Sequence, residues 1–340
     1  MSTSPVLRQF ALGPGVWPTL DPFLFCVHHV DHYPASNGKF GPRASLEGRS
    51  IGADFSGKDG WSMYHGEDVP GFPGHPHRGF ETVTVMRSGY VDHADSLGAA
   101  ARYGEGDVQW LTAGRGVVHS EAFPLLREDA PNPAELFQIW LNLPAVSKMA
   151  DPAFTMFWSG AIPELAATDA AGRKTTVRVT AGALEGAGPP LAPPKDSWAA
   201  RDEADVAIWT IRMDPGASWT LPATLRAGTR RALYLFRGAA QVAGTPFSSA
   251  TGLELAASAP VDLVAGSDGT EFLLLQGRPI GEPVAQHGPF VMNTQEQVMQ
   301  AFRDYQRTQF GGWPWDSAAP IHGTEAKRFV RHPDGRIETP

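Results

Sequence analysis

The chain has 340 residues, including 37 glycines and 30 prolines, and a formal net charge of −8. Its length suggests about two domains, and a hydrophobic content of 42% is enough for a packed core, which excludes wholesale disorder. The acidic balance argues against extended contact with nucleic-acid phosphates. A single cysteine excludes an intramolecular disulfide and a cysteine-based zinc site.

We expect no targeting signal in the N-terminal region. The first 20 residues contain one arginine and are interrupted early by glycine and proline, so we expect no signal peptide. No uncharged apolar stretch reaches the roughly 18 residues of a membrane-spanning helix. We therefore expect a cytoplasmic protein with no membrane contact. Cys26 lies in an apolar run and is expected to be a small buried side chain.

Alternating apolar and polar residues predict β-strands along most of the chain. The predicted strands cover 82–86, 137–141, 176–179, 206–213, 232–236 and 272–275. A loop is predicted for 161–172. Because glycine and proline separate the strands and no helical pattern intervenes, we expect an antiparallel sandwich or barrel. The pattern runs twice, with a joint near residue 160.

One helix is predicted near the C-terminus, over 294–310. Thr294 and Gln297 have the spacing of a capping box. The apolar residues that follow with helical periodicity, and are expected to pack against the body, are Val298, Ala301, Phe302 and Tyr305. Residues 28–74 and the tail from Trp315 are predicted to be irregular. A loop as long as 28–74 inside a compact domain is typically functional or mobile.

Histidine is unevenly distributed, since eight of the eleven histidines precede residue 120. His75 and His77 stand two residues apart before a predicted strand, so both rings share one face of an extended chain. His119 and Glu121 repeat this spacing after a glycine-rich turn. Two such pairs brought together would offer three imidazoles and a carboxylate, a set that suits a divalent first-row metal with open coordination positions.

The spacing leaves alternatives open. Glu81 shares the odd-numbered parity of His75 and His77 and is a second candidate for the carboxylate ligand. The alternative to a metal site is that these histidines are surface residues or satisfied core residues, although two such pairs in one domain are less easily accidental. The histidines expected to be solvated are His28, His29, His32, His65, His93, His287, His322 and His332. Arg78 falls on the opposite strand face from His77, so we expect it to support the structure through an ion pair.

Two segments resemble the signature of the pirin family: Phe-Pro-Gly-His-Pro-His-Arg-Gly-Phe-Glu-Thr-Val at 72–83, and 106–121, which ends Val-Val-His-Ser-Glu. Shorter similarities lie at 21–23, 138–143, 214–217 and 286–294. The resemblance implies an all-β bicupin, with two tandem antiparallel β-barrel domains. The expected domains are a metal-binding cupin at 1–160, with an insertion at about 28–70, and a metal-free cupin at 161–340 that carries the helix and an irregular tail.

The resemblance also implies a ligand set. The family's ligands fall on His75, His77, His119 and Glu121, with one divalent transition metal, usually Fe(II), although other first-row metals are compatible. Glu81 matches the ligand position of generic cupins, which pirins do not use. The segment between Pro22 and Phe72 is longer than is usual in the family. We expect a surface loop without a role, and a lid over a pocket is the alternative.

Two functions of different classes are implied. Some pirins are similar to quercetin 2,3-dioxygenases, which open a flavonol ring with molecular oxygen, and here Glu121 would act as general base. This function requires a small aromatic substrate and dioxygen. We expect no direct binding to nucleic acid, and we expect a monomer. The alternative is a metal-dependent regulatory protein that binds a protein partner without turnover. A third hypothesis is a storage or structural cupin with a vestigial metal.

Overall fold

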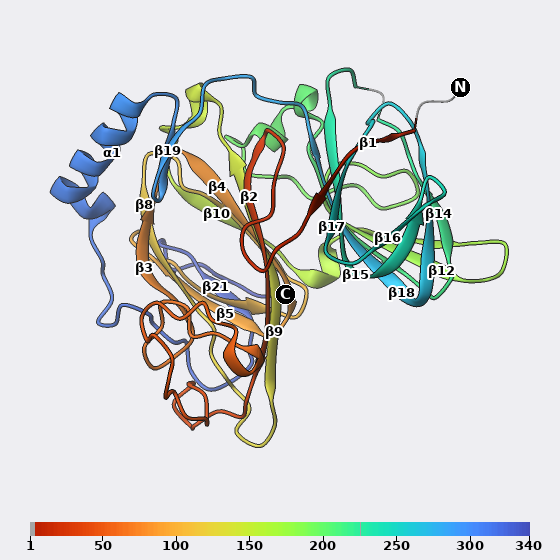
Figure 1. Cartoon of the computed structure of the whole chain (residues 1–340). Coiled ribbons are helices and arrows are strands. Elements are labelled where there is room, and N and C mark those ends of the chain that lie inside the picture. Colours follow the sequence, from red (N-terminus) through yellow and green to blue (C-terminus); the bar gives the residue numbers. More distant parts are fainter. Residues whose placement is uncertain (1–3, 225) are drawn as a thin grey trace. The chain divides into compact units, whose positions relative to one another are not determined.

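The structure, a computed structural model, describes residues 4–224 and 226–340. It consists mainly of antiparallel β-strands with one longer helix in the described part, which confirms the predicted fold class (Figure 1). Two compact units are present. The N-terminal unit comprises 28–139, 145–160 and 282–340, and the C-terminal unit comprises 4–27, 140–144 and 161–281. No helix in the described ranges is long and apolar enough to span a membrane.

Two sheets form the N-terminal unit. The first sheet has the order β10 (Ala153–Phe157), β7 (Val108–Thr112), β4 (Phe80–Ser88), β9 (Asn132–Asn142) and β2 (Phe23–Tyr33). The second has the order β22 (Ile337–Glu338), β21 (Phe329–Arg331), β6 (Ala100–Gly104), β5 (Tyr90–Asp95), β8 (Val117–Ala122) and β3 (Gly71–His77). A separate ladder joins β19 (Ala285–His287) to β20 (Phe290–Met292).

Strand β4 shows how the sequence pattern becomes structure. It contains the predicted strand 82–86, in which valine and threonine alternate, so the two side-chain types lie on opposite faces. Alternation of this kind normally places the polar face in solvent. Here Phe80 to Met86 are all buried, so both faces of β4 are covered. The threonine face is therefore polar although it is buried, and the Thr84 hydroxyl lies within hydrogen-bond distance of the buried Glu121 and the partly buried Gln138.

The C-terminal unit is built around one large sheet. Its order is β1 (Val6–Ala11), β17 (Thr251–Leu255), β15 (Arg230–Val242), β18 (Val261–Gly277), β13 (Ala207–Met213), β12 (Lys174–Ala181) and β11 (Glu164–Thr168), with β14 (Ser218–Leu221) paired to β18 and β16 (Thr245–Ser248) to β15. Leu233 and Leu235 alternate along β15 and enter one core with Phe272 and Leu274 of β18. Burial of each such side chain contributes about 1.5–3 kcal/mol.

Helix α1 (Gln295–Thr308) confirms the predicted helix and its N-terminal signal. The Thr294 hydroxyl accepts a hydrogen bond from the backbone N–H of Gln297, and the Gln297 side chain accepts one from the backbone N–H of Thr294. The apolar stripe packs against β19 and β20. Figure 1 shows α1 beside β19 at the edge of the N-terminal unit. Short 3₁₀ turns occur at Lys58–Gly60, Ala145–Ser147, Ser159–Ala161, Trp198–Ala200, Asp202–Ala204 and Gln309–Gly311.

Three segments predicted to be irregular contain strands. Residues 28–33 complete β2, so the irregular segment between β2 and β3 is 34–70. The predicted loop at 161–172 contains β11, which pairs with β12. Its sequence Glu-Leu-Ala-Ala-Thr alternates in exposure but contains only one β-branched residue, Thr168, and no aromatic residue to signal a strand. In the tail, β21 pairs with β6 and β22 with β21.

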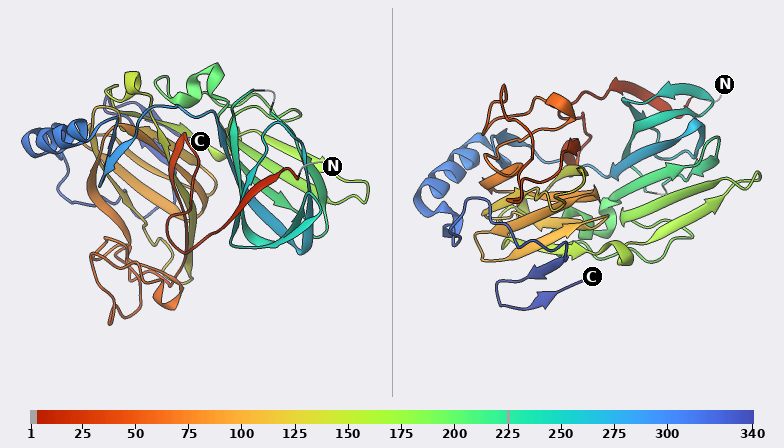
Figure 2. Two further views of the ribbon diagram at one scale, coloured as in Figure 1. Left: turned by 45° about the horizontal axis from the view of Figure 1, so that its top comes forward. Right: turned by 90° about the horizontal axis from the view of Figure 1, so that it is seen from below.

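The 34–70 segment, drawn in red to orange in Figures 1 and 2, has its own buried polar framework. Arg49 and Asp54 form an ion pair with 2.9 Å between Nη1 and Oδ2, and both side chains are completely buried. The guanidinium also donates to the carbonyls of Lys58 and Trp61 and stacks on the Trp61 ring. Because a buried charge is tolerated only when it is paired, this set of contacts holds the segment in one conformation.

Arg78 has the structural role that its parity predicted. Its Nη1 lies 2.9 Å from Oδ2 of Asp304 on α1, and its Nε donates to the carbonyl of Arg115 at 2.6 Å. The guanidinium carbon lies 4.5 Å from the centre of the Phe310 ring. The predicted ion pair is confirmed, and it joins α1 to the β3–β4 turn.

We expect Arg78→Met to lower the free energy of unfolding by about 1–3 kcal/mol, since it leaves a buried carbonyl without its donor and removes a charge pair. Thermal and urea unfolding measure this loss, and metal affinity should stay near the parental value. Arg307→Met is the matched control, because Arg307 also pairs with Asp304 but is 76% exposed. A drop in metal affinity at parental stability would contradict the assignment.

Candidate metal centre

Three of the predicted ligands come together inside the N-terminal unit. His75 and His77 lie on β3 and His119 on β8, and the pairing of these strands places His75 directly opposite His119. One ring nitrogen from each histidine lies within 4.8 Å of the others, a grouping found in the described part of the chain. The ring centres of His75 and His119 are 4.4 Å apart. The three histidine rings of the two i, i+2 pairs therefore converge, as the sequence predicted.

Backbone contacts orient two of the rings. Nδ1 of His75 donates to the carbonyl of Pro73 at 2.9 Å, and the His77 ring is hydrogen-bonded to the backbone of Pro289. A backbone partner of this kind selects the tautomer and leaves the other nitrogen of His75 as a lone-pair donor. Neither ring nitrogen of His119 has a hydrogen-bond partner, although the side chain is completely buried. An imidazole left in this state is costly unless something else binds it.

Burial keeps the three rings neutral. Desolvation lowers the pKa of His75 to about 4 and holds the pKa values of His77 and His119 well below the ordinary value. The neighbouring histidines act in the same direction, since two cationic rings in contact repel each other. Neutral imidazole is the form that binds a metal.

Glu121 lies beside this group on the same strand as His119. Its Oε2 is 3.9 Å from Nε2 of His119 and accepts a hydrogen bond from Nε2 of Gln138 at 3.1 Å. Its Oε1 is 3.2 Å from the hydroxyl of Thr84. Burial raises the pKa of the carboxyl group. The structure thus places the predicted carboxylate next to the histidines, held by side chains of β4 and β9.

The second candidate carboxylate has a different environment. Glu81 is completely buried on β4 and accepts a hydrogen bond from the Thr112 hydroxyl at 2.7 Å. Thr112 is its cross-strand neighbour on β7. In the described residues the converging group consists of His75, His77 and His119 and contains no oxygen of either Glu81 or Glu121. The contact that distinguishes Glu121 is the distance of 3.9 Å between its Oε2 and Nε2 of His119.

The prediction that the His93 side chain is solvated is wrong. His93 is completely buried on β5, directly opposite Glu121 in the β5–β8 pairing, and its ring centre is 5.5 Å from that of His119. Asp95 stands opposite His119 and lies 3.3 Å from Nε2 of His93. The signal was present, because His93 and Asp95 repeat the i, i+2 spacing.

Other histidines also differ from the expectation. His28 and His29 belong to β2 and are only partly exposed, and His322 is partly buried with its ring bonded to the carbonyl of His93. His32 and His287 are exposed, as predicted. Cys26 is free and completely buried, which confirms its reading as a small core side chain.

The residues present fit a divalent transition metal. Three neutral imidazoles and a neighbouring carboxylate are the ligand types that Fe(II) and related first-row metals accept, and the unpartnered ring of His119 supplies a donor atom with no competing hydrogen bond. The contacts of His75 with Pro73 and of Glu121 with Gln138 are those of a supporting layer around a metal site.

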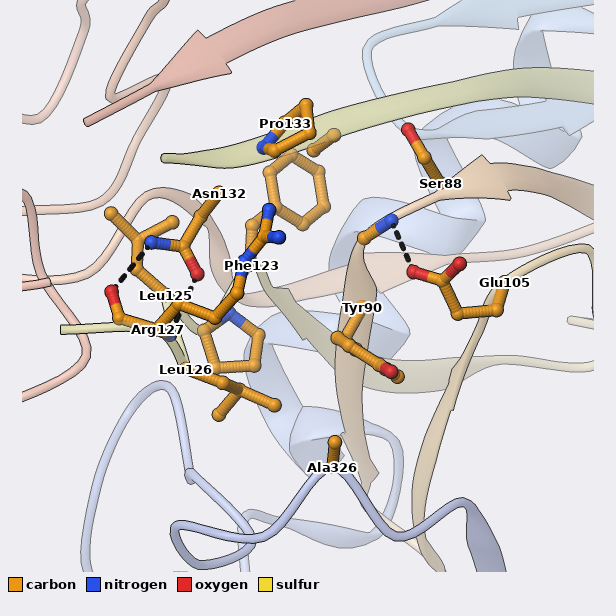
Figure 3. Close-up of a pocket in the computed structure, with 13 residues that line it drawn as sticks. Ser88, Tyr90, Glu105, Phe123, Leu125, Leu126, Arg127, Asn132, Pro133 and Ala326 are labelled. Carbon is orange, nitrogen blue, oxygen red and sulfur yellow. Dashed lines mark hydrogen bonds between the residues drawn. The ribbon is translucent and has the colours of Figure 1, made fainter. Parts of the chain in front are cut away.

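A separate pocket of about 330 Å³ lies in the same unit (Figure 3). Its residues include Tyr90, Glu105, Phe123, Leu125, Arg127 and Asn132. Glu105 accepts a hydrogen bond from the Gly89 backbone and Asn132 accepts one from that of Arg127, so both polar side chains stabilise turns. None of the three grouped histidines nor Glu121 lines this pocket, and it has no part in the metal centre.

The strand order and the buried histidine group define an all-β protein of two cupin-type domains with a candidate metal centre in one of them. The family model for pirin matches residues 17–141, and that for the pirin C-terminal cupin domain matches residues 208–311. This chain belongs to the pirin family.

Individual relatives agree with this assignment. A pirin-like protein of Caulobacter vibrioides is 38% identical over 241 residues, which cover 71% of this chain and 80% of the relative. Pirin-1 of Arabidopsis thaliana is 38% identical over 247 residues, covering 71% and 78%. The crystal structure of a quercetin 2,3-dioxygenase from Acinetobacter baumannii superposes with a TM-score of 0.70 at 26% identity and covers 92% of this chain and 99% of that one.

Proposed function

We propose that this pirin-family protein is a metal-dependent dioxygenase that opens the ring of a flavonol such as quercetin with molecular oxygen. The observation that carries the proposal is the buried histidine group beside Glu121. The similarity to the quercetin dioxygenase of Acinetobacter baumannii, at 26% identity over most of both chains, supports the substrate class. We further propose an intracellular, monomeric protein with Fe(II) as the metal.

The proposed holders of the metal are His75, His77, His119 and Glu121. A ferrous ion there would supply the redox chemistry that dioxygen needs to react with an organic substrate, with open positions for both. The burial of His77, His119 and Glu121 excludes bulk water from the site, and His75 is the partly exposed member of the set.

Glu121 has the geometry of a general base. A flavonol must lose its hydroxyl proton before its hydroxyl and neighbouring carbonyl act as an anionic pair, and Oε2 of Glu121 is the acceptor we assign. Gln138 donates to this oxygen at 3.1 Å and keeps the carboxylate directed toward His119. A base positioned in this way contributes about 10²–10⁴-fold to a rate.

The test is flavonol cleavage by the iron-loaded protein, measured as loss of quercetin absorbance together with oxygen consumption. Parental protein should consume both reactants in equal amounts, and His75→Ala should consume neither above the rate of free iron. A protein that retains its iron but leaves a panel of flavonols intact would contradict the enzyme proposal.

A further inference from the structure

The candidate ligands differ in their exposure to solvent. His77, His119 and Glu121 are buried, whereas His75 is partly exposed. A substrate that approaches the centre from the side of His75 first contacts the side chains around this ring. One of these side chains is Phe72, whose ring in turn contacts Phe55 and His65 of the 34–70 segment.

An aromatic group continues outward from His75. The ring centre of Phe72 is 6.2 Å from that of His75. His65 lies 5.8 Å from Phe72, and Phe55 lies 6.4 Å from Phe72 and 5.0 Å from His65. Phe55 has a large apolar side chain, yet the residue is 57% exposed to solvent. The rings of His75, Phe72, His65 and Phe55 thus form a continuous row from the candidate metal ligand to solvent, which we call the aromatic edge.

Contacts on both sides of Phe55 hold this edge in place. Asp54 precedes it and is fixed by the buried ion pair with Arg49 and by the Ser56 hydroxyl, which donates to it at 2.6 Å. Nδ1 of His65 donates to the carbonyl of Gly52 at 2.7 Å. Because the backbone around Phe55 is already ordered, binding a ligand against its ring costs little conformational entropy.

We propose that Phe55 is a specificity-determining residue: it receives the ring system of a flat polycyclic chelating substrate whose hydroxyl and carbonyl oxygens face the metal centre. The 34–70 segment would then be part of the substrate site, and the protein would favour polycyclic chelators over small ones. The inference rests on the proposed function for its substrate class, and it names the residue through which this chain selects within that class.

Binding separates this inference from turnover. Dissociation constants are measured by absorbance with the iron(II)-loaded protein under anaerobic conditions, for quercetin and for 3-hydroxy-4-pyranone, which has the same chelating pair on one ring. We expect Phe55→Ala to weaken quercetin binding about 3- to 10-fold, the value of one aromatic contact. The pyranone constant should change by less than about twofold, because this ligand does not reach the aromatic edge. Phe55→Tyr should restore quercetin binding.

Met299→Ala is the matched control, since Met299 is 54% exposed on α1, and it should bind both ligands like the parent. Equal quercetin affinity of Phe55→Ala and the parent would overturn the inference and leave the proposed function standing. Equal losses for both ligands would also overturn it, because they would indicate damage to the metal centre. A parent that binds quercetin without cleaving it would contradict the proposed function alone, and a parent that binds no quercetin would overturn both.

Discussion

His119→Ala is expected to remove the metal and flavonol turnover together. His119 faces His75 across the β3–β8 ladder, and its ring is buried with no hydrogen-bond partner at either nitrogen. Replacement of residues that only support a metal ligand costs about 10- to 100-fold in affinity, so loss of the ligand itself should cost more than about 100-fold. Metal analysis after dialysis should find one metal per chain in the parent and almost none in the variant.

The control is His287→Ala, because His287 is exposed in the same unit and should leave metal content unchanged. His119→Ala also leaves a cavity, so its folding is checked by circular dichroism against metal-free parent. A variant with parental iron content would show that His119 is not a ligand. Two tightly bound metals per parental chain would contradict a different expectation, that the C-terminal domain holds none: residues 161–286 contain neither histidine nor cysteine.

Much of the site was accessible from the sequence because its geometry is local. The rings of His75 and His77 share a face since two residues of extended chain return to the same side, and the same holds for His119 and Glu121. What joins the pairs is the β3–β8 ladder, whose register shifts between Phe72 and His75. An irregularity of this kind follows from the packing of both strands and cannot be read from either strand alone.

The features that sequence reasoning missed depend on distant partners. β1 pairs with β17, about 240 residues further along the chain, so the N-terminal strand belongs to the C-terminal unit. His93 gains its place in the site from the β5–β8 pairing. In the 34–70 segment, glycine, serine and charged residues gave the appearance of an unstructured loop. Its order comes from the burial of Arg49 with Asp54, which composition does not show.

Glu121→Gln is expected to retain part of its metal while losing most of its turnover, by about 10²–10⁴-fold in kcat. The substitution keeps the size of the side chain and an acceptor oxygen for Gln138, but it removes both the negative charge and the base. The charge matters because the three histidine rings are neutral, which leaves Glu121 as the group that balances a divalent ion. Measurements of kcat and iron content on the same preparations separate the two effects.

Glu81→Gln is the comparison that gives this experiment its meaning. Glu81 is also a completely buried carboxyl group, yet it accepts a hydrogen bond from Thr112 across the β4–β7 ladder, whereas Oε2 of Glu121 lies 3.9 Å from Nε2 of His119. We expect Glu81→Gln to keep its iron and most of its turnover, with any cost appearing as lower thermal stability. If Glu121→Gln instead cleaved flavonols at the parental rate with metal bound, Glu121 would not be the base. A parallel loss of turnover in Glu81→Gln would then assign the proton transfer to Glu81.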